Sequence, residues 1–340
     1  MTNHTFVEFA KLIRIKSLGM SMIPVIGALS ISSDLFLGDF FILFFIGVLI
    51  NAVGFMLNDL VDLNKDKVSP DFKNRPMVQL FLSPRLVKKL IIFFFLIVVL
   101  TVILYFQNIF ALIALLIGSG FGILYDLFGK KIYGSDFLLA SAFASFYIFG
   151  TLTQSNDFSS FNIIFILLIF FQVLYFNMIE GGLKDAYNDY KTGAKTIASR
   201  MGVKTKPKII VPNNFKFIAI FLDSIIICLI ISPFLFIQTI YEFGYWFIPL
   251  VFLLLVIVNS NYTMFRMLYM KKFQRDVLQK IIGIQELSRF FIYLGLLVLL
   301  TKSFLWSVFL ILIPILWALI WMLIFKLIFH QSLPRTSKLL

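Results

Sequence analysis

Long apolar segments follow one another along almost the whole of this 340-residue chain. A helix rises about 1.5 Å per residue, so about 20 apolar residues cross a hydrocarbon core of about 30 Å. The composition agrees, because 60% of the residues are hydrophobic, more than a soluble domain carries. We predict an all-α, polytopic membrane protein, a bundle of nine or ten transmembrane helices around a central cavity. The candidate spans are 18–36, 39–57, 87–106, 109–125, 135–153, 161–180, 216–237, 243–260, 286–302 and 304–328.

The first candidate span is the least regular of the ten. Gly19, Pro24, Gly27 and several serines interrupt it. The residues before it are typical of an amphipathic lead-in to a span and lack the pattern of a cleaved signal peptide. No low-complexity tract or soluble domain divides the chain, so we expect residues 1–340 to form a single membrane-embedded domain.

Basic residues gather on alternate loops. If the spans alternate, Lys302 is the only one of the 30 lysines and arginines that falls on the opposite side. Cytoplasmic loops of membrane proteins carry an excess of Lys and Arg. The long connections, at about 58–86, 181–215 and 261–285, share this basic side. We therefore expect a multi-pass protein of the cell membrane whose cavity, active site and both termini are on the cytoplasmic side.

Charge and composition exclude other classes of function. The net charge of +13 suggests a nucleic-acid partner, but no soluble basic domain exists to bind one, and the charges follow membrane topology instead. No nucleic acid is expected, and no protein partner is predicted. Cys228 is the single cysteine, and His4 and His330 are near opposite ends of the chain, so a His/Cys metal site is not expected.

An acidic cluster follows the second apolar segment. Asn58, Asp59, Asp62 and Asp66 form the pattern N-D-x-x-D-x-x-x-D. If the helix of the second span continues through them, the carboxylates at i, i+3 and i+7 share one face. Three anions on one face repel one another unless a cation binds, and oxygen ligands without His or Cys favour Mg²⁺.

A second acidic cluster lies at the end of the sixth segment. Asp185 and Asp189 are four residues apart, again on one helix face, with glycines on both sides of them. With alternating spans, both clusters open toward the same side of the membrane. Two carboxylate groups among Lys and Arg fit a diphosphate held through Mg²⁺, because the metal bridges carboxylates to phosphate oxygens and neutralises a leaving diphosphate.

The two clusters resemble the motifs of the UbiA superfamily of intramembrane prenyltransferases. The first pattern resembles the family's first aspartate-rich motif, and D-x-x-x-D-x-x-x-G-x-x-T from Asp185 to Thr196 resembles the second. Arg75 with Pro76, and Tyr125 with Lys130, resemble two further family elements. Tyr187 and Asn188 replace the Glu and Gly of many members, which removes one possible metal ligand. The similarity covers about residues 10 to 300, so 304–328 would be an additional helix.

The resemblance implies Mg²⁺-dependent transfer of a polyprenyl group from an allylic diphosphate to a small acceptor within the membrane. The acceptors compatible with the motifs are an aromatic quinone precursor, a lipid precursor such as a glyceryl phosphate ether, a tetrapyrrole and a carotenoid. We expect one of the first two. The residues implied as catalytic metal ligands are Asp59, Asp62, Asp66, Asp185 and Asp189. The residues implied to bind the substrate diphosphate are Asn58, Arg75, Tyr125 and Lys130.

Two other classes of function stay open from the sequence. A secondary transporter also uses intramembrane acids, but it would carry them near the middle of the spans, where Asp223 is the only one. A catalytically inactive family member acting as a scaffold would have broken acidic motifs, and only the change at Tyr187 points that way.

Overall fold

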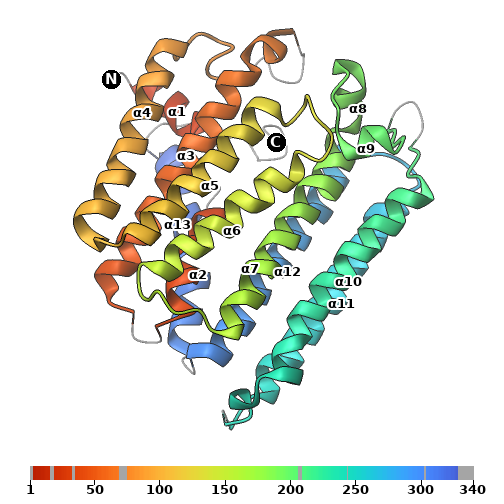
Figure 1. Ribbon diagram of the computed structural model, residues 1–340. Coiled ribbons are helices and arrows are strands. Elements are labelled where there is room, and N and C mark those ends of the chain that lie inside the picture. The colour runs from red at the N-terminus through yellow and green to blue at the C-terminus, as the bar shows by residue number, and fades with distance from the viewer. Residues whose placement is uncertain are drawn as a thin grey trace.

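The computed structural model describes residues 3–15, 19–32, 35–68, 75–205, 209–242, 244–301 and 304–327. In these ranges every regular element is a helix (Figure 1). The helices are α1 (Asn3–Leu12), η1 (Gly19–Met22), α2 (Ile23–Leu29), α3 (Leu37–Val68), α4 (Pro84–Thr101), η3 (Val102–Phe106), α5 (Ile109–Phe128), α6 (Asp136–Leu152), α7 (Ser160–Tyr175), η4 (Phe176–Gly181), α8 (Gly182–Thr192), α9 (Ile197–Arg200), α10 (Asn213–Phe236), η5 (Gln238–Ile240), α11 (Phe247–Leu268), α12 (Arg275–Thr301) and α13 (Phe304–Leu327).

The helices have the length and surface of a membrane bundle. Among the described residues, seven helices are long and apolar enough to cross a membrane, and two shorter apolar helices, Asp136–Leu152 and Ile315–Lys326, accompany them. Large apolar side chains such as Phe93, Phe110 and Leu255 remain exposed, as expected of a surface that meets lipid. The prediction of an all-α membrane protein is confirmed. The number of nine or ten transmembrane helices stays a prediction.

The predicted first span, 18–36, is wrong as a single long helix. The described part of it forms the 3-10 helix η1 and the seven-residue helix α2, while residues 18, 33 and 34 lie outside the described ranges. Every residue of α2 is buried. It crosses α6 so closely that a Cβ on Gly150 would lie 1.9 Å from the carbonyl oxygen of Pro24. Only glycine fits at such a crossing.

Three helices extend further into the polar regions than hydropathy predicts. α3 continues to Val68, α12 already begins at Arg275, and the helix of α7 runs through the π-helical turn η4 into α8. The predicted long loops at 58–86, 181–215 and 261–285 are therefore partly helical. Hydropathy misses these extensions because a helix with one polar face has a low average hydropathy. Two of the extensions, at the ends of α3 and α8, carry the acidic clusters.

A buried charged pair joins η4 to α12. Arg289 Nη1 lies 2.7 Å from Glu180 Oε1, and neither side chain is more than 6% exposed. The amide of Gln285, in the orientation that satisfies both neighbours, donates to Glu180 and accepts from Arg289. The guanidinium also lies 4.0 Å from the centre of the Tyr175 ring. Ionised groups in a membrane interior need such partners, so this cluster fixes α12 against α7 and η4.

Candidate active site

The first acidic cluster lies on the polar end of α3. Because α3 is unbroken through Val68, Asp59, Asp62 and Asp66 lie on one helix face. Each residue is no more than 7% exposed. Buried carboxylates are costly unless cations or hydrogen-bond donors compensate them, so the partners of these three side chains define the site.

Cations from three other parts of the chain hold these carboxylates. Arg75 Nη1 lies 3.0 Å from Asp59 Oδ1, and the same guanidinium also pairs with Asp66. Arg14 Nη2 lies 3.4 Å from Asp59 Oδ1. Lys130, in the turn after α5, places Nζ 2.8 Å from Asp62 Oδ2. In this arrangement a cation contacts at least one oxygen of each carboxylate, where a metal ion would otherwise bind.

The second acidic cluster lies on α8. Asp189 is buried, whereas the side chain of Asp185 is 39% exposed, with Arg275 Nη2 at 3.3 Å and Lys184 Nζ at 3.9 Å. The helix enters this segment through the π turn η4 and ends at Gly193, whose φ of 65° makes a left-handed cap. The glycines before Asp185 therefore do not interrupt the helix.

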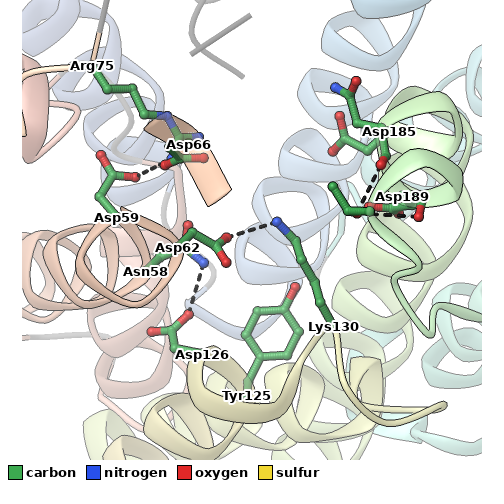
Figure 2. A network of polar contacts seen from close by, with 12 residues as sticks. Asn58, Asp59, Asp62, Asp66, Arg75, Tyr125, Asp126, Lys130, Asp185 and Asp189 are labelled. Atoms are coloured by element: carbon green, nitrogen blue, oxygen red, sulfur yellow. Dashed lines mark hydrogen bonds and ion pairs between the residues drawn. The ribbon is translucent and has the colours of Figure 1, made fainter. Parts of the chain in front are cut away.

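The two clusters face one space. Figure 2 shows Asp62 on one side, Asp185 and Asp189 on the other, and the ammonium of Lys130 between them. The loops that follow α5 and α8 are also joined, because the backbone N–H of Lys195 donates to the carbonyl oxygen of Lys130 at 3.1 Å. The residues of the two motifs, far apart in the sequence, thus meet at one end of the bundle.

A small pocket adjoins the first cluster. Its volume is about 40 Å³, and it lies beside the hydrogen bond from Asn58 Nδ2 to Asp126 Oδ1, 3.3 Å long. This volume holds roughly three water molecules. The lining residues are Asn58, Val61, Asp62, Tyr125, Asp126, Leu127, Gly129, Lys130 and Lys131.

Tyr125 is held by a polar chain that the sequence did not reveal. Its hydroxyl donates to Asn177 Oδ1 at 3.0 Å, and Asn177 Nδ2 donates to Asp136 Oδ1 at 2.7 Å. Arg275, the partner of Asp185, is also absent from the sequence-based site. Neither Asn177 nor Arg275 belongs to a recognisable sequence motif. The only signal for Asn177 is that it is a polar side chain within an apolar segment.

The donor set fits Mg²⁺, although the carboxylates are not arranged around a metal position. Among the described residues, no group of three His, Cys, Asp or Glu side chains is close enough to hold a metal ion. The five aspartates nevertheless offer only oxygen donors, which suit Mg²⁺. Movement of Arg75 and Lys130 away from these carboxylates would free the oxygens for it.

Two titratable groups at the edge of the site have altered proton affinity. Burial raises the pKa of the Asp66 carboxyl to about 6, although Arg75 acts in the opposite direction. Burial lowers the pKa of the Lys130 ammonium, but the carboxylate of Asp62 outweighs this effect and raises it overall. Lys130 therefore stays cationic at neutral pH, as a partner for an anionic substrate must.

The chain is similar to a known family of proteins in sequence and to several solved structures in fold. The model of the UbiA prenyltransferase family matches residues 21–268. The chain is similar to a structure of digeranylgeranylglyceryl phosphate synthase in membranes, with 20% identity and a TM-score of 0.64 over 88% of this chain and 100% of that chain. A UbiA homolog from Archaeoglobus fulgidus bound to GPP and Mg²⁺ gives 17% identity and a TM-score of 0.64, over 85% of this chain and 99% of that chain.

A third structure, the apo form of a UbiA homolog from Aeropyrum pernix K1, gives 16% identity and a TM-score of 0.63, over 84% of this chain and 98% of that chain. At such identities these structures show a shared fold. No curated protein matches the chain.

Proposed function

Because the chain belongs to the UbiA prenyltransferase family, we propose that it transfers a polyprenyl group from an allylic diphosphate to a small acceptor within the membrane. The observation that carries this proposal is the pair of acidic clusters, on α3 and α8, around one space that also contains Lys130 (Figure 2). Carboxylates and cations together suit a metal-bound diphosphate better than either kind of group alone.

Mg²⁺ is the proposed cofactor. Its ligands would come from Asp59, Asp62 and Asp66 on α3 and from Asp185 and Asp189 on α8. When bound, Mg²⁺ supplies positive charge that stabilises the leaving diphosphate. The structure of the Archaeoglobus fulgidus homolog with GPP and Mg²⁺ supports this choice.

The cations of the site would bind the diphosphate by exchanging partners. In the structure Arg75 and Lys130 neutralise the carboxylates of α3. Once a metal compensates those carboxylates, the guanidinium and the ammonium can turn to the phosphate oxygens, where charge-assisted hydrogen bonds are strong. Asn58 and Tyr125 would add neutral hydrogen bonds to the same oxygens.

The proposed reaction breaks the bond between the allylic carbon and the diphosphate oxygen. The electron pair leaves with the diphosphate, and the resulting allylic cation is attacked by the acceptor, which then loses a proton. Buried surroundings exclude water that would otherwise capture the cation. We propose an aromatic quinone precursor or a lipid precursor such as a glyceryl phosphate ether as the acceptor.

The proposal includes the arrangement of the chain in the membrane. Residues 1–340 would form one domain, with η1 and α2 in the first pass and α1 leading into it. The number of passes would be nine, or ten if α13 also crosses the membrane. Both acidic clusters lie toward the upper end of the bundle in Figure 1. We place this end, the opening of the cavity and both termini on the cytoplasmic side, because the basic loops are there.

The test is a prenyl-transfer assay on the full chain in lipid nanodiscs. The protein is incubated with farnesyl or geranylgeranyl diphosphate, Mg²⁺ and a panel of acceptors, and the prenylated product and released diphosphate are measured. Asp62→Ala and Asp185→Ala are each expected to abolish turnover. Asp157→Ala, which changes an exposed aspartate in the loop between α6 and α7, is the matched control and should keep full activity.

Full activity in both Asp62→Ala and Asp185→Ala would remove the metal assignment. Movement of a labelled solute across a proteoliposome membrane without diphosphate release would instead establish the transporter alternative, which the family match does not favour.

A further inference from the structure

The last helix that the structure describes, α13, is bound to the segment just after α1. Trp317, on α13, donates its indole N–H to the carbonyl oxygen of Ile15 at 2.6 Å, across 302 positions of sequence. The Trp317 ring also packs edge-on against Phe44 of α3, with 5.6 Å between centroids. Both partners of the hydrogen bond lie outside residues 21–268, which the family model matches. This contact is therefore a feature of the chain beyond the matched region.

A second contact zone shows that the docking of α13 is extensive. Phe325 is buried together with Val7 and Ala10 of α1. Trp321 stacks on Phe6, with centroids 6.2 Å apart. The indole of Trp317 is thus one specific polar bond within a largely apolar interface between α13 and α1.

The carbonyl that Trp317 holds lies just beyond the end of α1, where the backbone is strained. Arg14 has a φ of 46°, a left-handed conformation that residues with a side chain adopt rarely and keep only when the surroundings fix it. Its N–H donates to the carbonyl of Lys11, and the N–H of Ile15 donates to that of Ala10. The helix ends here, so the carbonyl of Ile15 has no partner within α1. The indole N–H supplies one.

The strained residue is also one that reaches the acidic cluster. Arg14 Nη2 lies 3.4 Å from Asp59 Oδ1, and the guanidinium lies 4.3 Å from the centre of the Phe55 ring on α3. A shift of the backbone at Ile15 also moves the Cα atom of Arg14, from which this side chain extends. A continuous set of contacts therefore runs from α13 through Ile15 and Arg14 to Asp59.

We propose that Trp317 is a positioning residue for prenyl transfer: by holding the carbonyl of Ile15, it keeps the guanidinium of Arg14 beside Asp59 at the diphosphate site. This inference rests on the proposed function, which takes Asp59 as a metal ligand. Without the indole N–H, Arg14 is free to leave its left-handed conformation. The site then loses a cation that balances its carboxylates before substrate arrives and attracts the diphosphate.

The first test compares single changes on the same helix. Trp317→Phe keeps an aromatic ring against Phe44 and removes the N–H. It is expected to raise KM for the allylic diphosphate about three- to tenfold, the effect of one lost hydrogen bond, with kcat within about twofold of wild type. Trp321→Phe, which keeps its ring against Phe6, is the control and should leave both constants unchanged.

A double variant tests whether Trp317 acts through Arg14. If it does, Arg14→Ala with Trp317→Phe has the same KM as Arg14→Ala alone. A wild-type KM in Trp317→Phe, or effects of the two changes that multiply, would overturn the proposal. Trp317→His retains a ring N–H, and recovery of a lower KM in this variant is expected.

A readout without turnover separates this inference from the proposed function. Trypsin cleaves after Arg14 once that segment is released, so mass spectrometry of brief digests should show cleavage there at least threefold faster in Trp317→Phe than in wild type and Trp321→Phe. Equal cleavage rates in all three would contradict the positioning role. Failure of the wild type to transfer any prenyl group would contradict the proposed function. The cleavage rates would then still decide whether Trp317 holds Ile15 and Arg14 in place.

Discussion

At the scale of single residues, Asp66 would couple the proposed metal binding to pH. Its pKa is raised to about 6 by burial, against the effect of Arg75. Between about pH 4 and pH 6 the folded chain holds a proton on Asp66 that the unfolded chain has released. The metal-free protein therefore loses some stability as pH rises through this window. A metal ion that uses this carboxylate has to displace the same proton.

We expect Mg²⁺ binding to weaken as pH falls below about 6, by up to about tenfold per pH unit from this group. Titrations of Mg²⁺ at pH 5, 6 and 7, followed by isothermal calorimetry in the presence of an allylic diphosphate, measure this. Asp66→Asn should bind Mg²⁺ more weakly at pH 7 and show a smaller change with pH. Asp157→Asn should follow wild type. Binding by wild type that is constant from pH 5 to pH 7 would contradict the assignment.

The sequence predicted the acidic residues of the site better than their partners. A local spacing that places side chains on one helix face is visible in the sequence for Asp59, Asp62 and Asp66. The same holds for Asp185 and Asp189. The partners are set by the tertiary fold: Arg14 is 45 positions from Asp59 and Arg275 is 90 positions from Asp185. No local pattern connects residues so far apart. The family resemblance named Arg75 and Lys130, but as residues that bind the diphosphate and not as partners of the carboxylates.

At the scale of elements, the crossing of α2 and α6 depends on the absence of a side chain. Gly150→Ala would place a Cβ 1.9 Å from the backbone oxygen of Pro24. We expect it to destabilise the protein by about 3 kcal/mol, at the upper end for overpacking, because a backbone rather than a side chain has to move. Thermal unfolding in detergent, followed by size-exclusion chromatography, measures the loss.

The control for this change is Gly120→Ala on α5, where no atom lies within 4 Å of the added Cβ. A helix favours Ala over Gly by about 0.5–1 kcal/mol, so this variant should be as stable as wild type or more so. Equal unfolding temperatures for Gly150→Ala and Gly120→Ala would show that α2 does not pack on α6 as described.

The Glu180–Arg289 pair gives a second prediction about elements. Arg289→Met leaves a buried carboxylate without its cation and is expected to cost about 3–5 kcal/mol of stability. Combination with Glu180→Leu removes the remaining charge and should recover most of that loss. Thermal unfolding of the two single variants and the double variant measures the coupling. Additive losses would indicate that the two side chains do not interact.

Hydropathy predicted most apolar helices but not where they break or how far they extend. The first pass is divided because Gly19, Pro24 and several serines lower its helix propensity. The short helix α2 is stabilised by its close packing on α6. The start of α12 at Arg275 was missed because its first turns carry charged residues. The π turn η4 has no sequence signal, since its residues differ little from those of an ordinary helix.

At the scale of the whole molecule, the proposed topology predicts which loops lie on the cytoplasmic side of the membrane and which lie outside. In a Cys228→Ser background, Asp157→Cys places a thiol in the exposed loop between α6 and α7, and Lys195→Cys places one in the exposed loop after α8. A membrane-impermeant maleimide added to intact cells is expected to label Asp157→Cys at once. It should label Lys195→Cys only after the membrane is permeabilised. The reverse pattern would invert the proposed topology.

The π turn η4 changes the direction in which the side chains of the second cluster point. A π turn contains one residue more than the α-helix accommodates, and one residue corresponds to about 100° of rotation around the axis. Everything after Gly181, including Asp185 and Asp189, is therefore turned by that angle relative to a regular continuation of α7. With one residue fewer in this turn, both carboxylates would point about 100° away from the opposing cluster.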